Sequence, residues 1–442
     1  MSETEPHTYS SGYRRWALFI LIVVYTLNFL DRQIISILAV PIKADLKLTD
    51  TQLGLLGGLA FAAFYATLGI PIAWLADRKS RVWIITVALT LWSAMTALCG
   101  LAQNYLQLFL ARLGVGVGEA GGVAPSYSLL TDYFPPEQRG RAMGAYSLGI
   151  PVGSAIGICL GGALSTLVDW RFAFVFVGFL GVAVAPVFRL TMKDPARGQY
   201  DPPGARTEPA PFMSVFRTLS RKPGFWLLSF GAASSSMMGY GLFFWLPSFL
   251  VRSYGGELPE FMSFLPDILQ PDGAGPLLYA AYYYGIIVLI GGIVGIWFGG
   301  VLADKYGVND KGSYARVPAI AFIATIPFFL LGTLSTSLLM SFFVFLVPTA
   351  LALVWLGPVI AAIQQITPPN MRTTASALFL LINNLTGIAL GNYILGQLSD
   401  LLAPNFGDES LRYALLSGTV FYLIAAILFL FAARRLPQDW EA

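Results

Sequence analysis

Ionisable residues are scarce in this chain of 442 residues, of which Asp, Glu, Lys and Arg together make up 12%. A soluble globular domain carries about 25% of these residues. Hydrophobic residues reach 56%, and the formal net charge is only +3. The composition excludes an ordinary soluble domain, and the small charge excludes the strongly basic balance of a nucleic-acid-binding protein. It indicates a protein of the lipid bilayer.

Histidine and cysteine, the residues most often found in metal and nucleophilic sites, are almost absent. The one histidine, His7, lies in a polar N-terminal tail, and Cys99 and Cys159 fall in apolar segments. No His-Glu-x-x-His or paired zinc motif occurs, and two thiols make no disulfide framework. We therefore expect no metal, no cofactor and no enzymatic activity. An intramembrane enzyme is the alternative from another class, but no nucleophile stands at a recognisable spacing from the acids in apolar segments.

Long apolar runs are plentiful, and a run of about 20 residues can cross the hydrocarbon core as a helix. The first run is too long for a cleavable signal and has no small-residue cleavage site. We expect an all-α membrane protein of twelve spanning helices. They are predicted near residues 16–40, 52–76, 82–102, 105–130, 140–166, 171–190, 224–250, 277–303, 317–335, 338–364, 373–398 and 411–433.

Basic residues predict the orientation of these helices. With the N-terminus in the cytoplasm, most of the 27 Lys and Arg residues fall in cytoplasmic segments, as the positive-inside rule requires. An even number of helices then places both termini in the cytoplasm. We expect a multi-pass protein of the cell membrane that acts as a monomer.

A proline-rich segment with a basic cluster separates two sets of six helices. Within it, Phe212, Val215, Phe216 and Leu219 recur at the spacing of one helix face. This spacing predicts a short amphipathic helix on the cytoplasmic leaflet. The expected organisation is a cytoplasmic tail at 1–15, an N-terminal six-helix bundle at 16–190, a cytoplasmic linker at 191–223, a C-terminal six-helix bundle at 224–435, and a tail at 436–442.

Two motifs occur once in each half, in the same order. A glycine-to-aspartate motif closes the second and eighth apolar segments and ends in Asp77-Arg78 and Asp304-Lys305. A Pro-Pro-x-x-Arg loop precedes the fifth and eleventh segments and ends in Arg139 and Arg372. The repetition indicates a parallel internal duplication. It predicts two bundles related by a pseudo-two-fold axis along the membrane normal, with a cavity between them.

In combination, these motifs resemble the major facilitator superfamily across nearly the whole chain. Within it, Asn28-Phe-Leu-Asp31-Arg32, followed by Leu-Thr-Asp-Thr-Gln-Leu-Gly54, resembles the spinster family. The resemblance implies the major facilitator fold and a substrate like the lysophospholipids and sphingosine-1-phosphate that such proteins export. The Asp31-Arg32 pair, with Arg112 and Glu119 seven residues apart, also resembles the organic anion:proton symporters.

Two acids and two arginines stand inside apolar segments, Asp31 and Arg32 in the first and Arg112 and Glu119 in the fourth. A charge at the bilayer centre costs about 2.5–3.5 kcal/mol on insertion scales, so such residues usually face a polar path. The helical rise places Asp31 level with Arg112 in the outer half, and Glu119 two turns deeper. We expect the acids to exchange protons and the arginines to bind an anionic head group. The alternative is a structural set of ion pairs.

The repeated loop motifs predict a conformational latch. Asp77 follows a helix end, where it can pair with an arginine or with the N-terminus of a neighbouring helix. Such a cytoplasmic latch would hold the outward-open state, and the alternative is a solvated loop charge. The residues expected to act in gating are Asp77, Arg78, Arg81, Arg139, Asp304, Lys305 and Arg372.

The C-terminal half has no deep charge, so its expected substrate contacts are aromatic or amide side chains. An aromatic and apolar wall would suit an acyl chain, although most aromatic residues in spanning helices pack or anchor at the interface. The expected contacts are Tyr240, Phe244, Tyr283, Asn383 and Asn384.

Glycine recurs every fourth residue in the fifth span, at Gly149, Gly153, Gly157 and Gly161. This strip permits close approach of another helix. It also resembles the antiporter motif of the superfamily, with the difference that proline occupies position 151. Plain helix packing is the equal alternative.

The function we expect is proton-linked secondary active transport of an amphiphilic organic anion by alternating access. Following the resemblance, the substrate would be a lysophospholipid or sphingolipid-like lipid, and the other partners would be protons and the bilayer, with no nucleic acid. The alternative is proton-coupled symport of a small organic anion such as a carboxylate or sugar acid. A channel suits the paired halves less well.

Overall fold

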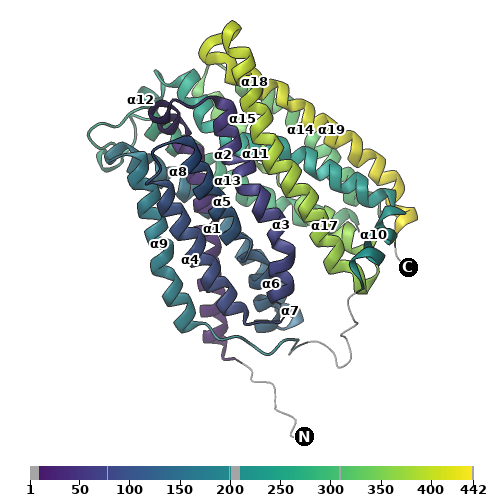
Figure 1. Ribbon diagram of the computed structural model, residues 1–442. Coiled ribbons are helices and arrows are strands. Elements are labelled where there is room, and N and C mark those ends of the chain that lie inside the picture. The colour runs from purple at the N-terminus through teal and green to yellow at the C-terminus, as the bar shows by residue number, and fades with distance from the viewer. Residues whose placement is uncertain (1–8, 77, 199, 201–209, 308–309, 441–442) are drawn as a thin grey trace, which may run out of the picture.

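The structure is a computed structural model that describes residues 9–76, 78–198, 200, 210–307 and 310–440 (Figure 1). The side chains at 136–137, 140, 300, 302–307, 369 and 373 lie outside the description. Every regular element in the described part of the chain is a helix. This confirms the all-α prediction.

The N-terminal half begins with a helix of 36 residues and continues through eight more. Side chains cap several of these helices: Ser10, Thr49, Asn104 and Asp169 each accept a hydrogen bond from the backbone three residues on, which satisfies an N–H that has no partner within the helix. The helices are α1 (Ser11–Leu46), α2 (Asp50–Gly57), α3 (Leu59–Ala76), α4 (Arg81–Cys99), α5 (Tyr105–Glu119), α6 (Val123–Tyr133), α7 (Pro136–Ser147), α8 (Gly149–Leu167) and α9 (Trp170–Thr191).

The linker contains the short helix α10 (Phe212–Ser220), at the place where the apolar spacing predicts one. The C-terminal half follows and ends in a helix of 30 residues. Its elements are α11 (Pro223–Tyr254), α12 (Leu258–Phe261), η1 (Asp267–Leu269), α13 (Pro276–Gly307), α14 (Ser313–Leu334), α15 (Leu338–Leu351), α16 (Leu356–Gln365), η2 (Pro369–Met371), α17 (Arg372–Asn384), η3 (Leu385–Leu390), α18 (Gly391–Phe406), η4 (Gly407–Glu409) and α19 (Ser410–Asp439).

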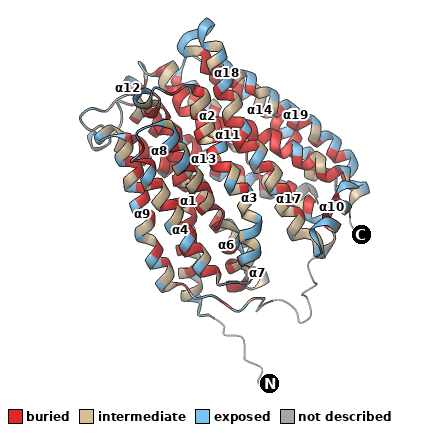
Figure 2. Ribbon diagram, viewed as in Figure 1, coloured by how far each residue is buried: buried red, intermediate tan, exposed pale blue. Residues whose placement is uncertain are grey.

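Each expected span falls on one helix or on two or three successive helices. Nine segments of the described chain are long and apolar enough to cross a membrane. Their outward faces carry large exposed apolar side chains, for example Phe179 at 71%, Leu190 at 83% and Trp297 at 67%. Figure 2 shows buried residues on the inner faces and exposed residues along the outer faces of helices such as α9 and α19. The chain is a multi-pass membrane protein.

Several spans are interrupted near their middle. The second changes from α2 to α3 at Gly58, the fourth from α5 to α6 at Ala120–Gly122, and the eleventh passes through the π-helix η3. Irregular backbone is tolerated at membrane depth where protein or a polar cavity surrounds it, and π-helical turns occur often at functional sites. These interruptions indicate a functional site in the interior between the two halves.

The two halves meet most closely at one end of the molecule. In Figure 1, α2 lies against α18 there, whereas the halves lie further apart toward the end that carries the N- and C-termini. We name these the loop end, which holds the α1–α2 connection, and the termini end. Within the N-terminal half, α1 packs on α8 and α4 on α9; within the C-terminal half, α11 and α14 pack on α19. Contact between α8 and α13 also joins the halves.

Glycine lets helices approach closely at two crossings. The strip on α8 faces α1, where a Cβ on Gly153 would lie 2.3 Å from the carbonyl oxygen of Thr26. Between the halves, a Cβ on Gly54 would lie 2.4 Å from the carbonyl oxygen of Asn392, and one on Gly58 would lie 2.8 Å from that of Ile388. No other residue fits at these positions without displacing backbone. Gly54 and Gly58 therefore set the distance of α2 from η3 and α18.

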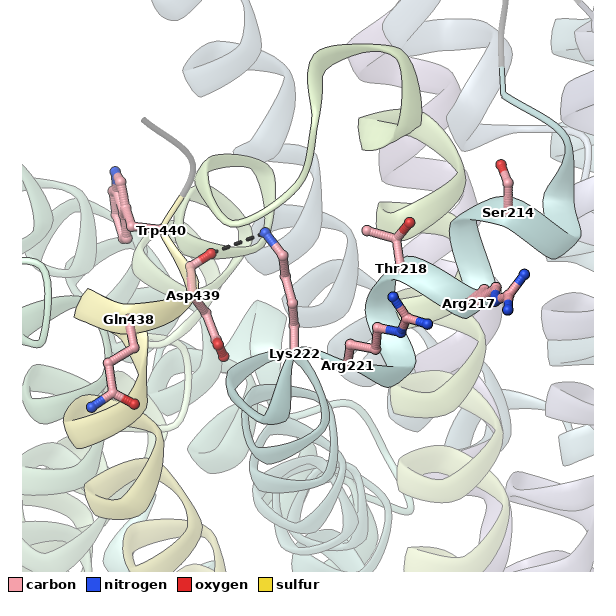
Figure 3. Close-up of a pocket in the computed structure, with 8 residues that line it drawn as sticks. All are labelled: Ser214, Arg217, Thr218, Arg221, Lys222, Gln438, Asp439 and Trp440. Carbon is pink, nitrogen blue, oxygen red and sulfur yellow. Dashed lines mark hydrogen bonds between the residues drawn. The ribbon is translucent and has the colours of Figure 1, made fainter.

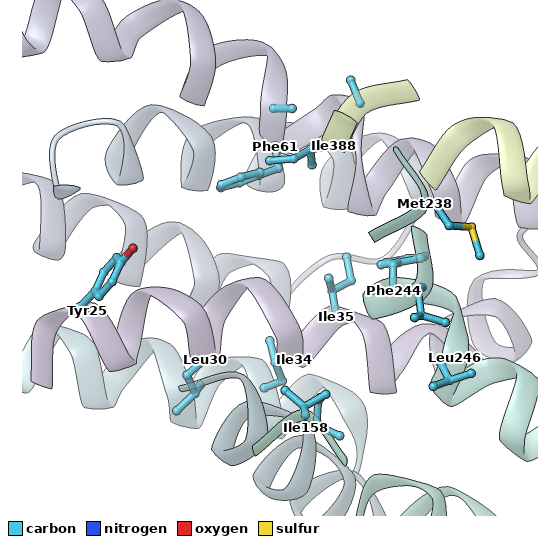
Figure 4. Packing of buried hydrophobic residues seen from close by; sticks show 14 of the residues in the cluster. Tyr25, Leu30, Ile34, Ile35, Phe61, Ile158, Met238, Phe244, Leu246 and Ile388 are labelled. Carbon is cyan, nitrogen blue, oxygen red and sulfur yellow. The ribbon is translucent and has the colours of Figure 1, made fainter. Parts of the chain in front are cut away.

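Apolar side chains fill the space around α1 as one continuous core. Figure 4 shows Leu30 and Ile34 of α1 beside Ile158 of α8, and Ile35 near Phe244 of α11. Ile35 and Phe244 belong to different halves, and both are buried. The apolar core thus crosses the boundary between the halves and surrounds the polar residues on the other turns of α1.

Candidate functional site

The four ionisable residues of the apolar spans converge between α1 and α5. Asp31, Arg112 and Glu119 are each no more than 2% exposed. Arg32 Nε donates to Glu119 Oε2 at 2.6 Å, and Arg112 Nη1 lies 3.4 Å from the carbonyl oxygen of Asp31. Arg112 and Glu119 are two turns apart on one face of α5. The cluster thus contains one ion pair, Arg32–Glu119, and a second arginine that contacts the backbone of Asp31 two turns away along α5.

This cluster retains unused hydrogen-bonding capacity. Asp31 Oδ1, Glu119 Oε1, Arg32 Nη2 and Arg112 Nε are buried without a hydrogen-bond partner among the described residues, as are both side-chain atoms of Asn28. A buried polar group without a partner costs free energy, because the hydrogen bonds it made to water are not replaced. A purely structural ion-pair set would use these atoms, so the arrangement favours a site that binds a ligand, water or a proton.

Three aromatic rings surround the Arg32 guanidinium. Its central carbon lies 5.0 Å from the ring centroid of Phe29, 4.8 Å from that of Phe61 and 4.3 Å from that of Tyr65. Such cation–π contacts hold a guanidinium while leaving its edges free to donate. The rings therefore orient Arg32 between Glu119 and the interior of the molecule.

A small cavity of about 40 Å³ lies beside this cluster, between the two halves. That volume holds about one water molecule. The N-terminal half contributes two arginines to its wall, and the C-terminal half contributes an aromatic and apolar wall. Its lining residues are Phe29, Arg32, Gln33, Gly57, Phe61, Arg112, Tyr240, Phe243, Phe244, Ile388 and Asn392.

The predicted site residues divide into two groups. Arg32, Arg112, Tyr240 and Phe244 line the cavity, whereas Asp31 and Glu119 do not, although Glu119 is hydrogen-bonded to Arg32. Tyr283 is elsewhere: its hydroxyl donates to the carbonyl oxygen of Leu338 at 2.7 Å.

The two asparagines at the end of α17, Asn383 and Asn384, do not line the cavity either. Asn383 accepts from Ser236 Oγ at 2.8 Å and lies 3.4 Å from the side-chain oxygen of Asn384. Two polar residues of the cavity wall were missed by the sequence analysis, Gln33 and Asn392. Both are polar residues within apolar spans, and this feature of the sequence could have identified them. Asn392 is 3% exposed, and its Oδ1 has no partner among the described residues.

A second polar network, which sequence analysis also missed, joins the halves at the loop end. Asp50 of α2 is 2% exposed. Its carboxylate accepts from both terminal nitrogens of Arg252 on α11 at 2.6 and 2.7 Å, and from Ser399 Oγ on α18 at 2.7 Å. Lys43 Nζ of α1 donates to the same carboxylate at 2.6 Å. A carboxylate of one half thus neutralises an arginine of the other.

Asp400 completes this network from the C-terminal half. Its carboxylate accepts from the backbone nitrogens of Asp50 and Thr51 at 3.0 and 2.7 Å, and from Thr51 Oγ1 at 2.6 Å. A carboxylate at a helix N-terminus is stabilised by the unpaired N–H groups there. The first turn of α2 is therefore capped by a residue of the other half. We call Lys43, Asp50, Thr51, Arg252, Ser399 and Asp400 the loop-end network.

Two predicted gating residues, Arg81 and Arg139, make contacts at the termini end. Arg81 is fully buried, forms an ion pair with Asp132, and donates to Asp194 and the carbonyl oxygen of Pro195. It thereby ties α4 to α6 and to the start of the linker. Arg139 donates to the carbonyl oxygens of Thr131 and Phe134.

The other gating residues make local contacts or lie outside the description. Arg78 lies 3.8 Å from the ring centroid of Trp74, and Arg372 Nε donates to the carbonyl oxygen of Thr367 at 3.2 Å. Asp77 lies outside the described residues, as do the side chains of Asp304 and Lys305. In the described part of the chain, no group of three or more His, Cys, Asp or Glu side chains could hold a metal ion.

Comparison with known proteins agrees with this architecture. The family model of the Major Facilitator Superfamily matches residues 21–391. An MFS-type efflux pump of Mycolicibacterium smegmatis is 32% identical over 435 residues, covering 96% of this chain and 94% of that protein. Protein spinster homolog 1 of Xenopus tropicalis is 28% identical, covering 97% of this chain and 82% of that protein.

Solved structures show the same relationship. A bacterial homologue of the human lysosomal transporter Spinster, in an inward-facing and unoccupied conformation, aligns with a TM-score of 0.83 and 31% identity. The alignment covers 98% of this chain and all of that one. The occupied inward-facing form aligns with a TM-score of 0.81. The chain therefore belongs to the major facilitator superfamily, and within it to the transporters of spinster type.

Proposed function

We propose that this protein is a proton-linked secondary active transporter of an amphiphilic organic anion, with lysophospholipids or sphingolipid-like lipids as its substrate class. The observation that carries the proposal is the buried cluster of Asp31, Arg32, Arg112 and Glu119, which borders a cavity between the halves and keeps unpaired polar atoms. Two arginines suit an anionic head group. The aromatic and apolar wall opposite them suits a hydrocarbon chain.

The proposed transport cycle is alternating access by two six-helix bundles, twelve spanning helices in all, related by a pseudo-two-fold axis. The protein would act as a monomer in the cell membrane, with both termini in the cytoplasm. Under this orientation the loop end is the outer end, and the loop-end network closes it. The close match to inward-facing relatives supports the same assignment.

Exchange of partners at Arg32 would link substrate to protons. Glu119 holds Arg32 at 2.6 Å in this conformation. An anionic head group that binds Arg32 would compete with Glu119 and remove the counter-ion of a fully buried carboxylate. Protonation would then neutralise that carboxylate, because an unpaired charge is costly in a low-dielectric interior. Release of the anion would return Glu119 to Arg32 and discharge the proton.

Reconstituted vesicles test this proposal directly. With a labelled lysophospholipid and an imposed pH gradient, wild-type protein should accumulate substrate against its gradient. Glu119→Gln and Asp31→Asn should bind substrate but lose pH-driven accumulation, because the amide cannot release a proton. Glu260→Gln, which removes an exposed acid of the short helix α12, is the matched control and should transport normally.

Two results would contradict the proposal. Full pH-driven accumulation by both acid variants would show that protons are not coupled through these residues. Accumulation of a labelled small carboxylate, with no uptake of the lysophospholipid, would assign the protein to small organic anions instead.

A further inference from the structure

A second cavity lies at the termini end, far from the charged cluster. It has a volume of about 690 Å³ and separates α10 from the last turn of α19. Figure 3 shows Arg217 and Arg221 extending from α10, with Asp439 and Trp440 across from them. Its lining residues are Ser214, Arg217, Thr218, Arg221, Lys222, Gln438, Asp439 and Trp440. We call it the linker pocket.

The charges of the linker pocket do not cancel. Lys222 Nζ donates to the carbonyl oxygens of Ile366 at 2.7 Å and Asp439 at 3.1 Å, and the carboxylate of Asp439 accepts from the backbone nitrogen of Gly224 at 2.6 Å. These two residues are thus engaged in holding α10, α11 and α19 together. The guanidinium groups of Arg217 and Arg221 have no ion pair or hydrogen bond among the described residues. The pocket therefore offers two free cationic groups.

The spacing on α10 presents these groups together. Ser214, Arg217, Thr218 and Arg221 follow one another at i, i+3, i+4 and i+7, so they share one face of the helix. Two guanidinium groups flanked by hydroxyls match the geometry of a phosphate, whose oxygens accept several hydrogen bonds at once. Phosphate chemistry therefore fits this surface better than a single carboxylate.

The surroundings of the linker pocket are those of a lipid surface. It lies where the long apolar helices α11 and α19 begin and end, which is the level of the lipid head groups. Phe212, Met213 and Phe216 of α10 expose 53%, 69% and 40% of their surface. Exposed apolar residues beside arginines on a short helix are typical of a helix lying in the membrane interface.

An aromatic path leads from α10 toward the membrane. The ring centroids of Phe216 and Trp226 are 6.1 Å apart, and those of Trp226 and Phe230 are 6.2 Å apart. Phe230, on the outward side of α11, is 48% exposed. A ligand with its phosphate at Arg217 and Arg221 would find an apolar surface for its chains beside the same helix.

From this arrangement, we propose that the linker pocket binds the phosphate head group of an anionic phospholipid of the surrounding leaflet, as a site separate from the transport cavity. The bound lipid holds the linker against the C-terminal half. The linker already contacts η2, where the backbone nitrogen of Ala210 donates to the carbonyl oxygen of Asn370 at 3.2 Å. Lipid composition would thereby act on the segment that connects the two halves.

The experiment measures lipid retention by the full chain in a neutral detergent. Native mass spectrometry would compare short-chain phosphatidylglycerol with phosphatidylcholine of the same chain length. Wild-type protein should prefer phosphatidylglycerol, and Arg217→Gln with Arg221→Gln should reduce that preference by about thirtyfold, as expected when two basic groups leave an anionic surface. Arg217→Lys with Arg221→Lys should keep most of it.

A matched control removes the same charge from the same end of the molecule. Arg15 and Arg434 are exposed and lie outside the linker pocket, so their replacement by glutamine should leave the preference unchanged. Melting in phosphatidylcholine alone checks that all variants fold equally.

Three outcomes would overturn the proposal. An unchanged preference in the pocket variant would show that the pocket does not bind the head group. An equal loss in the control variant would show diffuse attraction rather than a site. Displacement of phosphatidylglycerol by equimolar free glycerol 1-phosphate would assign the pocket to a soluble phosphate compound.

Discussion

Replacing Asp50 by asparagine should open the loop end. Asp50 alone receives four hydrogen bonds from Lys43, Arg252 and Ser399. Arg252 belongs to the other half, and its side chain is only 15% exposed. Asparagine keeps the shape of aspartate but leaves Arg252 without its counter-charge. The loss of this contact raises the free energy of the conformation in which the halves meet at the loop end.

The magnitude follows from the kind of contact that is lost. Breaking a buried ion pair by removing one partner costs about 3–5 kcal/mol, and the partial exposure of Arg252 and Lys43 lowers this to about 2–4 kcal/mol. That cost would shift the balance between closed and open loop end by about 30-fold to 1,000-fold. A population that is almost wholly closed would then contain a large open fraction.

Distance measurements between spin labels would detect the shift. Ala44 of α1 and Leu401 of α18 are exposed residues near the loop end on opposite halves. Cysteines placed there, in a chain whose Cys99 and Cys159 are replaced by alanine, carry the labels. Asp50→Asn should add a population at longer distance.

The control is Asp310→Asn, which breaks an exposed pair with Arg316 whose side chains are 38% and 51% exposed. An exposed pair contributes about 0–1 kcal/mol, and this one lies within a single half. The control should leave the distance distribution unchanged. If Asp50→Asn gives the same distribution as wild type, the loop-end network does not hold this conformation, and the reasoning fails.

Two further variants test the site and the packing. Arg112→Lys should bind the anionic substrate at least about tenfold more weakly, because a point charge replaces a planar donor of two hydrogen bonds; equal affinity in a direct binding assay would place Arg112 away from the head group. Gly153→Ala should lower the melting temperature by several degrees, because its Cβ would meet the Thr26 carbonyl oxygen and overpacking costs about 1–3 kcal/mol. The control is Gly144→Ala, whose Cβ would have nothing within 4 Å. This variant should melt at or above the wild-type temperature.

The spans were predictable from sequence because each is a long apolar run, and a bilayer allows such a run only one regular structure, the helix. The same pattern cannot show where a span breaks. Gly58 and Ala120–Gly122 interrupt apolar runs without a change in hydropathy. Their breaks depend on neighbours across the molecule, namely the backbone of η3 beside Gly58 and Trp92 beside Gly122.

The charged cluster was predictable as a set, but its pairing was not. Asp31 and Arg32 are adjacent, so they point about 100° apart on α1. Which arginine meets which acid depends on how α1 is rotated against α5, and one sequence carries no measure of that rotation. The structure pairs Arg32 with Glu119 and brings Arg112 to the backbone of Asp31.

Contacts between distant segments were the least predictable part. Asp50 and Arg252 are 202 residues apart, and each alone reads as a loop charge at the end of a span. In α13, neighbouring tyrosines gave no indication of which faces a cavity, and Tyr283 instead packs against Phe342. Asn392 was not predicted because a single amide in an apolar span gives only a weak pattern.

The crossing of α2 over η3 and α18 has a mechanical consequence for the proposed cycle. At Gly54 and Gly58 the halves touch backbone to backbone, so no side-chain rotamer has to unlock when one half rotates on the other. Asp50 stands one helical turn from Gly54, so a rotation that separates the halves at the loop end also tilts the hydrogen bonds of Asp50 to Arg252 and Ser399. Hydrogen bonds weaken steeply with angle, so a small rocking motion of the halves is enough to break the hydrogen bonds of Asp50.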